Sequence, residues 1–279
     1  MEPIDRTIDV GIKLHVRQWG GGESSFLLVH GLSSNAHTWD GVAQQLAAAG
    51  WAVTAVDQRG HGLSDKPASG YDFATVTADL RHLIDALELE KPVLAGQSWG
   101  GNVLLEFGAR YPNTASHLIF VDGGFLELYR RGSWEQIAIE LRPPNLNGTP
   151  RDLLKQRMSQ FHPDWSEAGI EATLHNFEAL PDGTVRPWLS LDRHMMILRA
   201  MYDQRPGDLY PLMQEPVLIC AADDGSEWAQ RKREPVVAAT AAIPHARALW
   251  FEHTDHDIHV QRPFALAQAM LEFVGEDGD

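Results

Sequence analysis

The sequence predicts an α/β fold: a doubly wound, mostly parallel sheet with an inserted all-helical cap. Two observations lead to this prediction. Short apolar runs that suit buried strands alternate along the chain with segments of helical periodicity. The alternation stops between residues 123 and 214, where helix starts are present but no convincing strand. Crossover helices on both faces of a parallel sheet explain the first observation, and a helical insertion explains the second.

Seven apolar runs are predicted as strands. Most are rich in Val, Leu, Ile and Ala without polar alternation, which is typical of parallel strands buried on both faces. In such sheets ligands bind at the carboxyl ends of the strands, so the residues at those ends are candidates for function. The predicted strands are Leu14–Trp19, Ser25–His30, Val53–Val56, Val93–Ala95, Leu118–Val121, Val217–Ala221 and Ala248–Phe251.

Five helices are predicted between or after these strands. Their apolar residues recur at the spacing of one helix face. A proline removes a backbone donor from a helix interior, so a break is expected near Pro235. The predicted helices are Trp39–Ala49, Phe73–Leu87, Gly100–Tyr111, Glu227–Ile243 and Pro263–Val274.

The domain prediction assigns residues 1–122 and 215–279 to the α/β core and residues 123–214 to a helical cap, called the cap segment below. Thr149 followed by Pro150 predicts a helix start, and residues 164–167 resemble a capping box. Pro181, Asp182 and Gly183 predict a turn. Residues 191–202 have helical spacing.

The composition of the chain indicates which partners it can bind and in which compartment it is expected. The chain carries 23 Lys and Arg against 38 Asp and Glu, a formal charge of −15, which argues against nucleic acid and anionic membranes. The single cysteine, Cys220, cannot form an intramolecular disulfide. The first residues lack an apolar signal region, and no run of about eighteen apolar residues is present. We therefore expect a soluble cytoplasmic protein; a homo-oligomer is left open.

Ser98 is the candidate nucleophile. It is the centre of Gly96-Gln97-Ser98-Trp99-Gly100, which lies between an apolar strand-like run and a helical pattern. This context is what a nucleophile elbow requires, since the sharp strand-to-helix turn projects the serine hydroxyl above the sheet. A serine needs a base within hydrogen-bond reach and a third group that orients the base.

Three histidines on one late loop compete for the role of base: His253, His256 and His259. The loop also contains Asp255 and Asp257, so a metal site is conceivable. However, the chain has neither an HExxH motif nor paired cysteines, and no metal is expected.

Three motifs together resemble the α/β-hydrolase superfamily over nearly the whole chain. They are the elbow around Ser98, the His30-Gly31-Leu32 loop after an early strand, and the DxRGHGxS segment from Asp57 to Ser64. The resemblance implies that His256, seven residues before Pro263, is the catalytic base; His253 and His259 remain minor candidates. It also implies that His30 and His61 are structural.

The resemblance leaves the acid of the triad open among three aspartates. The usual position, after the strand before the last, makes Asp224 the first choice and its neighbour Asp223 an alternative. In a variant of the family the acid follows the strand after the nucleophile helix, and Asp122 occupies that place. The oxyanion hole is assigned to the backbone N–H groups of Trp99 and Leu32.

The predicted activity is hydrolysis of small to medium, largely apolar carboxylic esters or lactones through an acyl-enzyme, without a cofactor. A serine at the elbow separates the chain from similar epoxide hydrolases and haloalkane dehalogenases, which use an aspartate there. Carbon–carbon bond hydrolases of diketone-like substrates, amidases and perhydrolases remain alternatives. A ligand receptor built on the same fold is the alternative from another class, and an inert interaction protein is the third.

Overall fold

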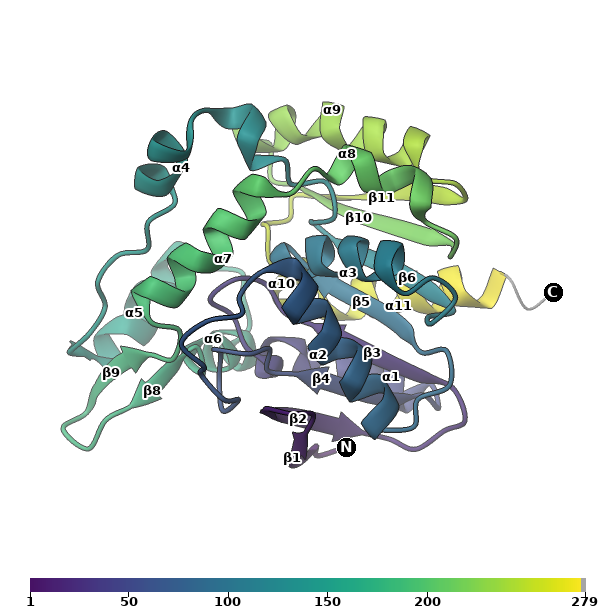
Figure 1. Cartoon of the computed structure of the whole chain (residues 1–279). Coiled ribbons are helices and arrows are strands. Elements are labelled where there is room, and N and C mark those ends of the chain that lie inside the picture. The colour runs from purple at the N-terminus through teal and green to yellow at the C-terminus, as the bar shows by residue number, and fades with distance from the viewer. Residues whose placement is uncertain (277–279) are drawn as a thin grey trace.

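The computed structural model of the chain describes residues 1–276 and is built around an eight-stranded sheet (Figure 1). The strand order is β1-β2-β4-β3-β5-β6-β10-β11. Strand β2 is antiparallel to β1 and β4, whereas all pairs from β4 to β11 are parallel. The predicted fold class is confirmed. The strands are β1 Ile4–Asp9, β2 Lys13–Trp19, β3 Ser25–Val29, β4 Ala52–Val56, β5 Val93–Gln97, β6 His117–Val121, β10 Val217–Asp223 and β11 Ala246–Glu252.

Helices cover both faces of this sheet because successive strand residues point to opposite sides. Leu27 belongs to the apolar cluster that includes α2, α3 and α9, whereas Leu28 belongs to the cluster that includes α1 and α11. Figure 1 shows α2 and α3 in front of the sheet and α11 behind it. The core helices are η1 Ala36–Trp39, α1 Asp40–Ala48, α2 Phe73–Ala86, α3 Trp99–Arg110, α9 Glu227–Ala242, α10 Ile258–Gln261 and α11 Pro263–Gly275.

Helix α9 runs unbroken through Pro235, so the predicted break is wrong. The residues on either side of Pro235 hold the helix on the sheet, since Lys232, Val236 and Ala239 are buried. Tertiary packing therefore outweighs the loss of one intrahelical hydrogen bond. Within residues 1–276, no helix combines the length and the apolar character that a membrane span needs.

The cap segment lies between β6 and β10 and is not all-helical, which corrects the prediction. Three short strands form a second sheet in the order β7-β9-β8. The predicted turn at residues 181–183 joins β8 to β9, with Gly183 at a positive φ of 80°. The elements are η2 Leu128–Arg131, α4 Trp134–Glu140, β7 Thr149–Pro150, α5 Arg151–Phe161, α6 Glu167–Leu174, β8 Phe177–Ala179, β9 Thr184–Pro187, α7 Leu191–Asp203, α8 Pro206–Leu209 and η3 Tyr210–Leu212.

Helix α6 begins two residues later than the pattern from Asp164 suggests. Its N-cap is Ser166, whose hydroxyl accepts a hydrogen bond from the N–H of Gly169 at 3.1 Å. Asp164 stays outside the helix and is free to contact the core. Figure 1 shows α4, α5, α7 and the β8–β9 hairpin gathered on one side of the molecule, away from the C-terminal end of α11.

Candidate active site

Ser98 occupies a one-residue turn between β5 and α3. Its backbone is strained, with φ 54° and ψ −118°. A serine in this region costs free energy, and such strain clusters at functional sites. The turn needs glycines on both sides, because a Cβ on Gly96 would lie 2.4 Å from the carbonyl oxygen of Gly100, and one on Gly100 would lie 2.5 Å from that of Val29. The sequence Gly96–Gly100 thus forms the predicted strand-turn-helix.

Asp122 is the carboxylate that the structure brings to His256. It follows the last residue of β6 and is 1% exposed. Its Oδ2 lies 2.6 Å from Nδ1 of His256, and its Oδ1 accepts a hydrogen bond from the N–H of Ala222 at 2.9 Å. Since β6 lies between β5 and β10, the acid sits beside the elbow and is held by the next strand.

The first choice for the acid, Asp224, is corrected by this geometry. Its Oδ1 accepts a hydrogen bond from the N–H of Ser226 at 3.0 Å, and its side chain is exposed. Asp223 accepts from the N–H of Gly225 at 3.0 Å and pairs with Arg233. The loop after β10 therefore turns outward to cap α9, and of the three candidates it is Asp122 that contacts His256.

His256 lies in the loop between β11 and α10, close to the elbow. The side-chain amide of Gln97, the residue before Ser98, donates to the carbonyl of His256 at 3.3 Å. The His256 side chain keeps 40% of its surface exposed, whereas that of Asp122 keeps 2%. The ring therefore presents one edge to a buried acid and leaves the other accessible, as a general base requires.

The two competing histidines lie in other environments. His253 is exposed and has a positive φ of 53°. His259 is 1% exposed and lies beside Trp39, with ring centroids 4.7 Å apart. Its ring nitrogens have no hydrogen-bond partner among residues 1–276, and burial lowers its pKa to about 3. Within the part of the chain that the structure describes, Asp122 contacts the ring of His256 and neither of these two rings.

The Asp122–His256 pair is electrostatically coupled. Burial favours the neutral form of Asp122, but the hydrogen bond and charge of His256 and the charge of Lys232 hold its pKa below the usual value. Burial also opposes protonation of His256, yet the hydrogen bond and charge of Asp122 raise its pKa above 6.5. Asp122 is therefore ionised and favours the imidazolium that forms when His256 accepts a proton.

The loop around Gly31, predicted to supply half of the oxyanion hole, packs directly against the elbow. A Cβ on Gly31 would lie 3.1 Å from Cβ of Ser98 and 2.2 Å from Oε1 of Gln97. The following residue, Leu32, is half-buried. Trp99, the second predicted donor, begins α3 and is 1% exposed. Trp99 thus follows Ser98 directly in the chain, and Leu32 follows a glycine that packs against Ser98.

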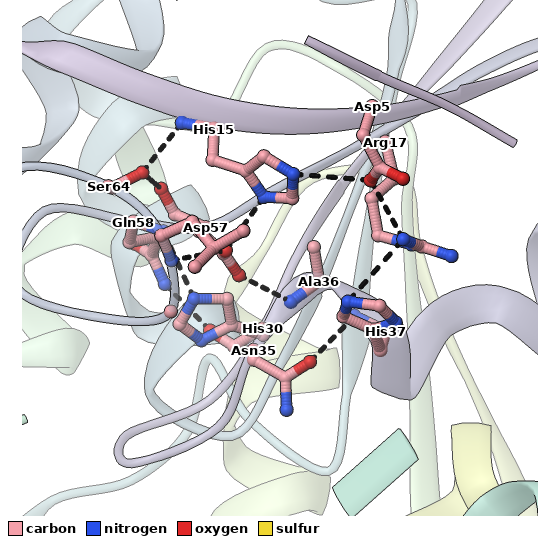
Figure 2. A network of polar contacts seen from close by, with 12 residues as sticks. Asp5, His15, Arg17, His30, Asn35, Ala36, His37, Asp57, Gln58 and Ser64 are labelled. Carbon is pink, nitrogen blue, oxygen red and sulfur yellow. Dashed lines mark hydrogen bonds and ion pairs between the residues drawn. The ribbon is translucent and has the colours of Figure 1, made fainter. Parts of the chain in front are cut away.

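A buried network around Asp57 supports this loop (Figure 2). The Asp57 carboxylate lies 2.8 Å from Nδ1 of His15 and accepts hydrogen bonds from the N–H groups of Ala36 at 2.7 Å and Leu63 at 2.9 Å. Close packing leaves room only for glycine at position 62, where a Cβ would lie 2.0 Å from Oδ2 of Asp57. Asp57 thus joins β2 to the loops after β3 and β4.

His30 and His61 engage the backbone with both ring nitrogens, which fits the structural role predicted for them. His30 Nδ1 lies 2.7 Å from the carbonyl of Gly31, and its Nε2 accepts from the N–H of Gln58 at 3.0 Å. His61 Nδ1 lies 3.0 Å from the carbonyl of Arg59, and its Nε2 accepts from the N–H of Ser33 at 3.2 Å. They fix the loop that carries Leu32.

The cap segment contacts both loops of the candidate site. His194 Nδ1 lies 2.9 Å from the hydroxyl of Ser33 in the first loop. Near His256, His162 Nδ1 lies 3.1 Å from Asp255, and the amide of Gln261 donates to Asp164 at 2.5 Å. Within residues 1–276, no three His, Cys, Asp or Glu side chains are arranged to hold a metal ion.

Comparison with known proteins gives a family match and several relatives. The model of the "Alpha/beta hydrolase family" matches residues 26–269. An "Epoxide hydrolase" from Caballeronia sordidicola is 39% identical over 208 residues, which cover 71% of this chain and 58% of the relative. A "2-(acetamidomethylene)succinate hydrolase" from Mesorhizobium japonicum is 36% identical over 120 residues, or 43% of this chain and 42% of the relative.

Solved structures agree in fold over nearly the whole chain. The crystal structure of an E-2-(acetamidomethylene)succinate hydrolase has a TM-score of 0.82 at 23% identity and covers 98% of this chain and 100% of that one. A thioesterase domain from the curacin biosynthetic pathway has a TM-score of 0.79 at 20% identity, covering 97% and 100%. In sequence, by contrast, the chain spans only 30% of the length of a similar mycobacterial protein (Mycobacterium bovis, 38% identical over 104 residues, 37% of this chain).

Proposed function

Because the chain belongs to the alpha/beta hydrolase family, we propose that it is a serine hydrolase of carboxylic esters or lactones, acting on small to medium, largely apolar substrates through an acyl-enzyme. The observation that carries the proposal is the 2.6 Å contact between Asp122 and His256 beside a strained Ser98. These are the base and its orienting acid, next to a candidate nucleophile, that acyl transfer by serine requires.

In the proposed reaction the Ser98 hydroxyl attacks the carbonyl carbon of the ester while Nε2 of His256 accepts the hydroxyl proton. Asp122 holds the ring through Nδ1 and stabilises the imidazolium. The N–H groups of Trp99 and Leu32 donate to the oxyanion of the tetrahedral intermediate. His256 then protonates the leaving alcohol. Water, activated by His256, attacks the acyl-enzyme and releases the acid.

Serine at the elbow argues against epoxide opening, although two relatives carry the name epoxide hydrolase. Attack of a serine hydroxyl on an epoxide carbon forms an ether, which the same machinery cannot hydrolyse. Attack on an ester carbonyl forms an acyl-enzyme, which water can cleave. The nucleophile therefore favours substrates with a carbonyl carbon next to a leaving group.

A second candidate is cleavage of a bond other than an ester in a substrate that still contains a carbonyl group. The similarity to a hydrolase of 2-(acetamidomethylene)succinate favours this candidate. The similarity in sequence covers 43% of the present chain, and the similarity in fold covers 98% of it. The same serine, histidine and aspartate would serve such a reaction. The choice between the two candidates depends on the substrate pocket.

The test is steady-state hydrolysis of p-nitrophenyl esters from acetyl to dodecanoyl by the wild type and by a folded Ser98→Ala variant. We expect turnover by the wild type with an optimum at short or medium acyl chains, and its loss in Ser98→Ala. Turnover that survives in Ser98→Ala would overturn the nucleophile. If the wild type reacts with a fluorophosphonate at Ser98 but cleaves no ester, the second candidate replaces the first.

A further inference from the structure

Helix α9 carries a lysine in the middle of its buried face. The buried residues of this helix are Ala229, Lys232, Val236 and Ala239, at spacings of three, four and three. This is the periodicity of the stripe that a helix packs against a sheet, where small and apolar side chains are expected. Lys232 is 4% exposed. A lysine at such a position needs a buried anion, since an unpaired buried charge is strongly unfavourable.

The anion that Lys232 contacts is Asp122, the proposed acid of the triad. Its Nζ lies 2.9 Å from Oδ1 and 2.8 Å from Oδ2 of the carboxylate. Oδ1 also accepts from the N–H of Ala222, and Oδ2 faces His256. Lys232 thus contacts both carboxylate oxygens of Asp122, and the orientation of Asp122 sets that of the His256 ring. The side chain of Asp122 is 2% exposed, so water screens this charge little.

Given the proposed function, we propose that Lys232 is a positioning residue for the reaction: its ammonium fixes the Asp122 carboxylate and sets the pH at which His256 becomes a base. The structure places the ammonium of Lys232 and the ring of His256 on one buried carboxylate, and both contact its Oδ2. The cation of Lys232 opposes the field through which Asp122 favours imidazolium. His256 is therefore deprotonated at a lower pH than it would be beside Asp122 alone.

Other ionisable groups also lie around this cluster. Besides Asp122 and Lys232, His256 is faced by Asp257 of its own loop and by His259 of α10. The charge of Lys232 also acts on Asp224, after β10. Behind Lys232, the charged residues that line the adjoining cavity are Glu127, Arg130, Arg131, Glu140, Arg231 and Glu234. Among the groups that act on His256, Lys232 lowers the pKa of its ring.

A cavity that Lys232 lines allows its role to be tested chemically. It has a volume of about 390 Å³ and lies between the chain that follows Asp122 and helix α9. Lys232, Phe125 and Leu126 line it together with exposed residues such as Arg231 and Glu234, so it is reached from solvent. A small alkylammonium ion that enters the space left by a truncated Lys232 can take the place of its ammonium group.

The first measurement is the NMR titration of the His256 ring in protein labelled at histidine, with His256→Gln used to assign the signal. In Lys232→Met we expect the midpoint to move to higher pH, because a cation near the ring has been removed. Lys232→Arg should keep the wild-type midpoint. Lys155→Met, which removes an ion-paired lysine of α5, is the matched control and should leave the midpoint unchanged.

The second measurement is the pH dependence of Ser98 labelling by a fluorophosphonate, which needs no natural substrate. The labelling rate falls in acid as His256 is protonated, and the midpoint of this fall should move to higher pH in Lys232→Met and Lys232→Ala. In Lys232→Ala, propylammonium should return it toward the wild-type position, while 1-propanol, of equal length but neutral, should not. Wild type that never reacts at Ser98 would defeat the proposed function, while the ring titration would still decide the role of Lys232.

An unchanged His256 midpoint in folded Lys232→Met would overturn the inference. If this variant does not fold, the comparison is made with Lys232→Gln, whose side-chain amide can still donate to Asp122 but carries no charge. The His256 midpoint should be higher in Lys232→Gln than in the wild type, and equal midpoints would again reject the role of Lys232.

Discussion

The backbone N–H of Ser98 donates to the carbonyl of Val121 at 2.9 Å, so the candidate nucleophile is hydrogen-bonded to the residue directly before Asp122. Strands β5 and β6 are neighbours in register, with Gln97 opposite Val121. The candidate nucleophile and the candidate acid therefore leave adjacent strands at the same height. The carboxylate that His256 contacts, Asp122, therefore follows β6, the strand next to the one that ends directly before Ser98.

The first prediction concerns the three aspartates. Asp122→Asn should lower kcat by about 10³-fold to 10⁴-fold, because His256 loses the carboxylate that fixes its tautomer and stabilises its cation. Asp224→Asn should stay within about twofold of the wild type, since its side chain is exposed and bonds only to its own turn. The measurement is kcat on the best p-nitrophenyl ester.

Far-ultraviolet circular dichroism and thermal melts of each variant serve as the control for folding. Asp223→Asn separates a structural effect from a catalytic one, because Asp223 pairs with Arg233 and lies at the end of β10. Asp223→Asn should lower the melting temperature and leave kcat close to that of the wild type. A large loss of kcat in Asp224→Asn, with Asp122→Asn active, would restore the first choice of acid.

The second prediction is an acid limb of kcat/KM with a midpoint above pH 6.5. Burial lowers the pKa of the His256 ring, but the hydrogen bond and charge of Asp122 outweigh it and raise the pKa. As pH falls through this raised value the ring is protonated and can no longer accept the Ser98 proton, so the rate falls. Since kcat/KM reports the free enzyme, the profile measures the ring directly.

In Asp122→Asn the same limb should move to lower pH, because the charge that favours imidazolium is gone. The residual activity of this variant, or its rate of fluorophosphonate labelling, gives the profile. A wild-type midpoint at or below 6.5, or an upward shift in Asp122→Asn, is incompatible with the coupling described above.

The third prediction concerns Gly123, the residue that follows the acid. A Cβ at this position would lie 2.2 Å from the carbonyl oxygen of Ser98. Gly123→Ala should therefore push the elbow away from β6, lower the stability by about 2 kcal/mol and reduce kcat. Urea unfolding and ester hydrolysis measure the two effects. Gly21→Ala is the matched control, since its Cβ would meet no atom within 4 Å, and it should leave both unchanged.

The fourth prediction concerns the stability that Asp57 provides. Burial favours its neutral form, but the His15 hydrogen bond and the charges of His30 and His15 hold the pKa of Asp57 below its usual value. Asp57→Asn should lower the free energy of unfolding at pH 7 by about 2 kcal/mol, because buried donors lose a charged acceptor. Urea unfolding measures this difference.

The sign of the pH dependence follows from the lowered pKa. The contribution of Asp57 is fully present above the unfolded value of about 3.9 and is lost as pH falls through the folded value. The gap between wild type and Asp57→Asn should stay constant from pH 7 to about pH 5 and narrow progressively as the pH falls further. Asp182→Asn, an exposed carboxylate in the β8–β9 turn, should show no such gap.

The sequence predicted the core well because buried parallel strands carry an unmistakable apolar pattern. All seven predicted strands correspond to observed ones, with ends that differ by a few residues. Strand β1 was missed because its residues are mostly exposed and polar. The strands of the cap segment were missed because they have two to four residues, too few to establish an alternation.

The positions of Asp122 and Lys232 could not be predicted from the sequence. Asp122 and Asp224 both follow apolar strand runs, and spacing alone does not reveal which carboxylate faces the histidine loop. The available signal was the pair Gly123 and Gly124 directly after Asp122, which allows close packing on the elbow. Lys232 was hidden for another reason: within Arg231, Lys232 and Arg233 it resembles a solvated charge run, and only the helix phase separates it from its neighbours.

The position of Asp122 has a consequence for how this protein can diverge. Asp223, Asp224, Gly225 and Ser226 form a surface turn whose side chains bond locally, to Arg233 or within the helix start. Because Asp122, and not Asp223 or Asp224, contacts His256, we expect this turn to tolerate insertions, deletions and fusion points that would inactivate a protein whose acid lies there. Natural variation in length should accumulate at this corner, while the three residues from Val121 to Gly123 stay fixed.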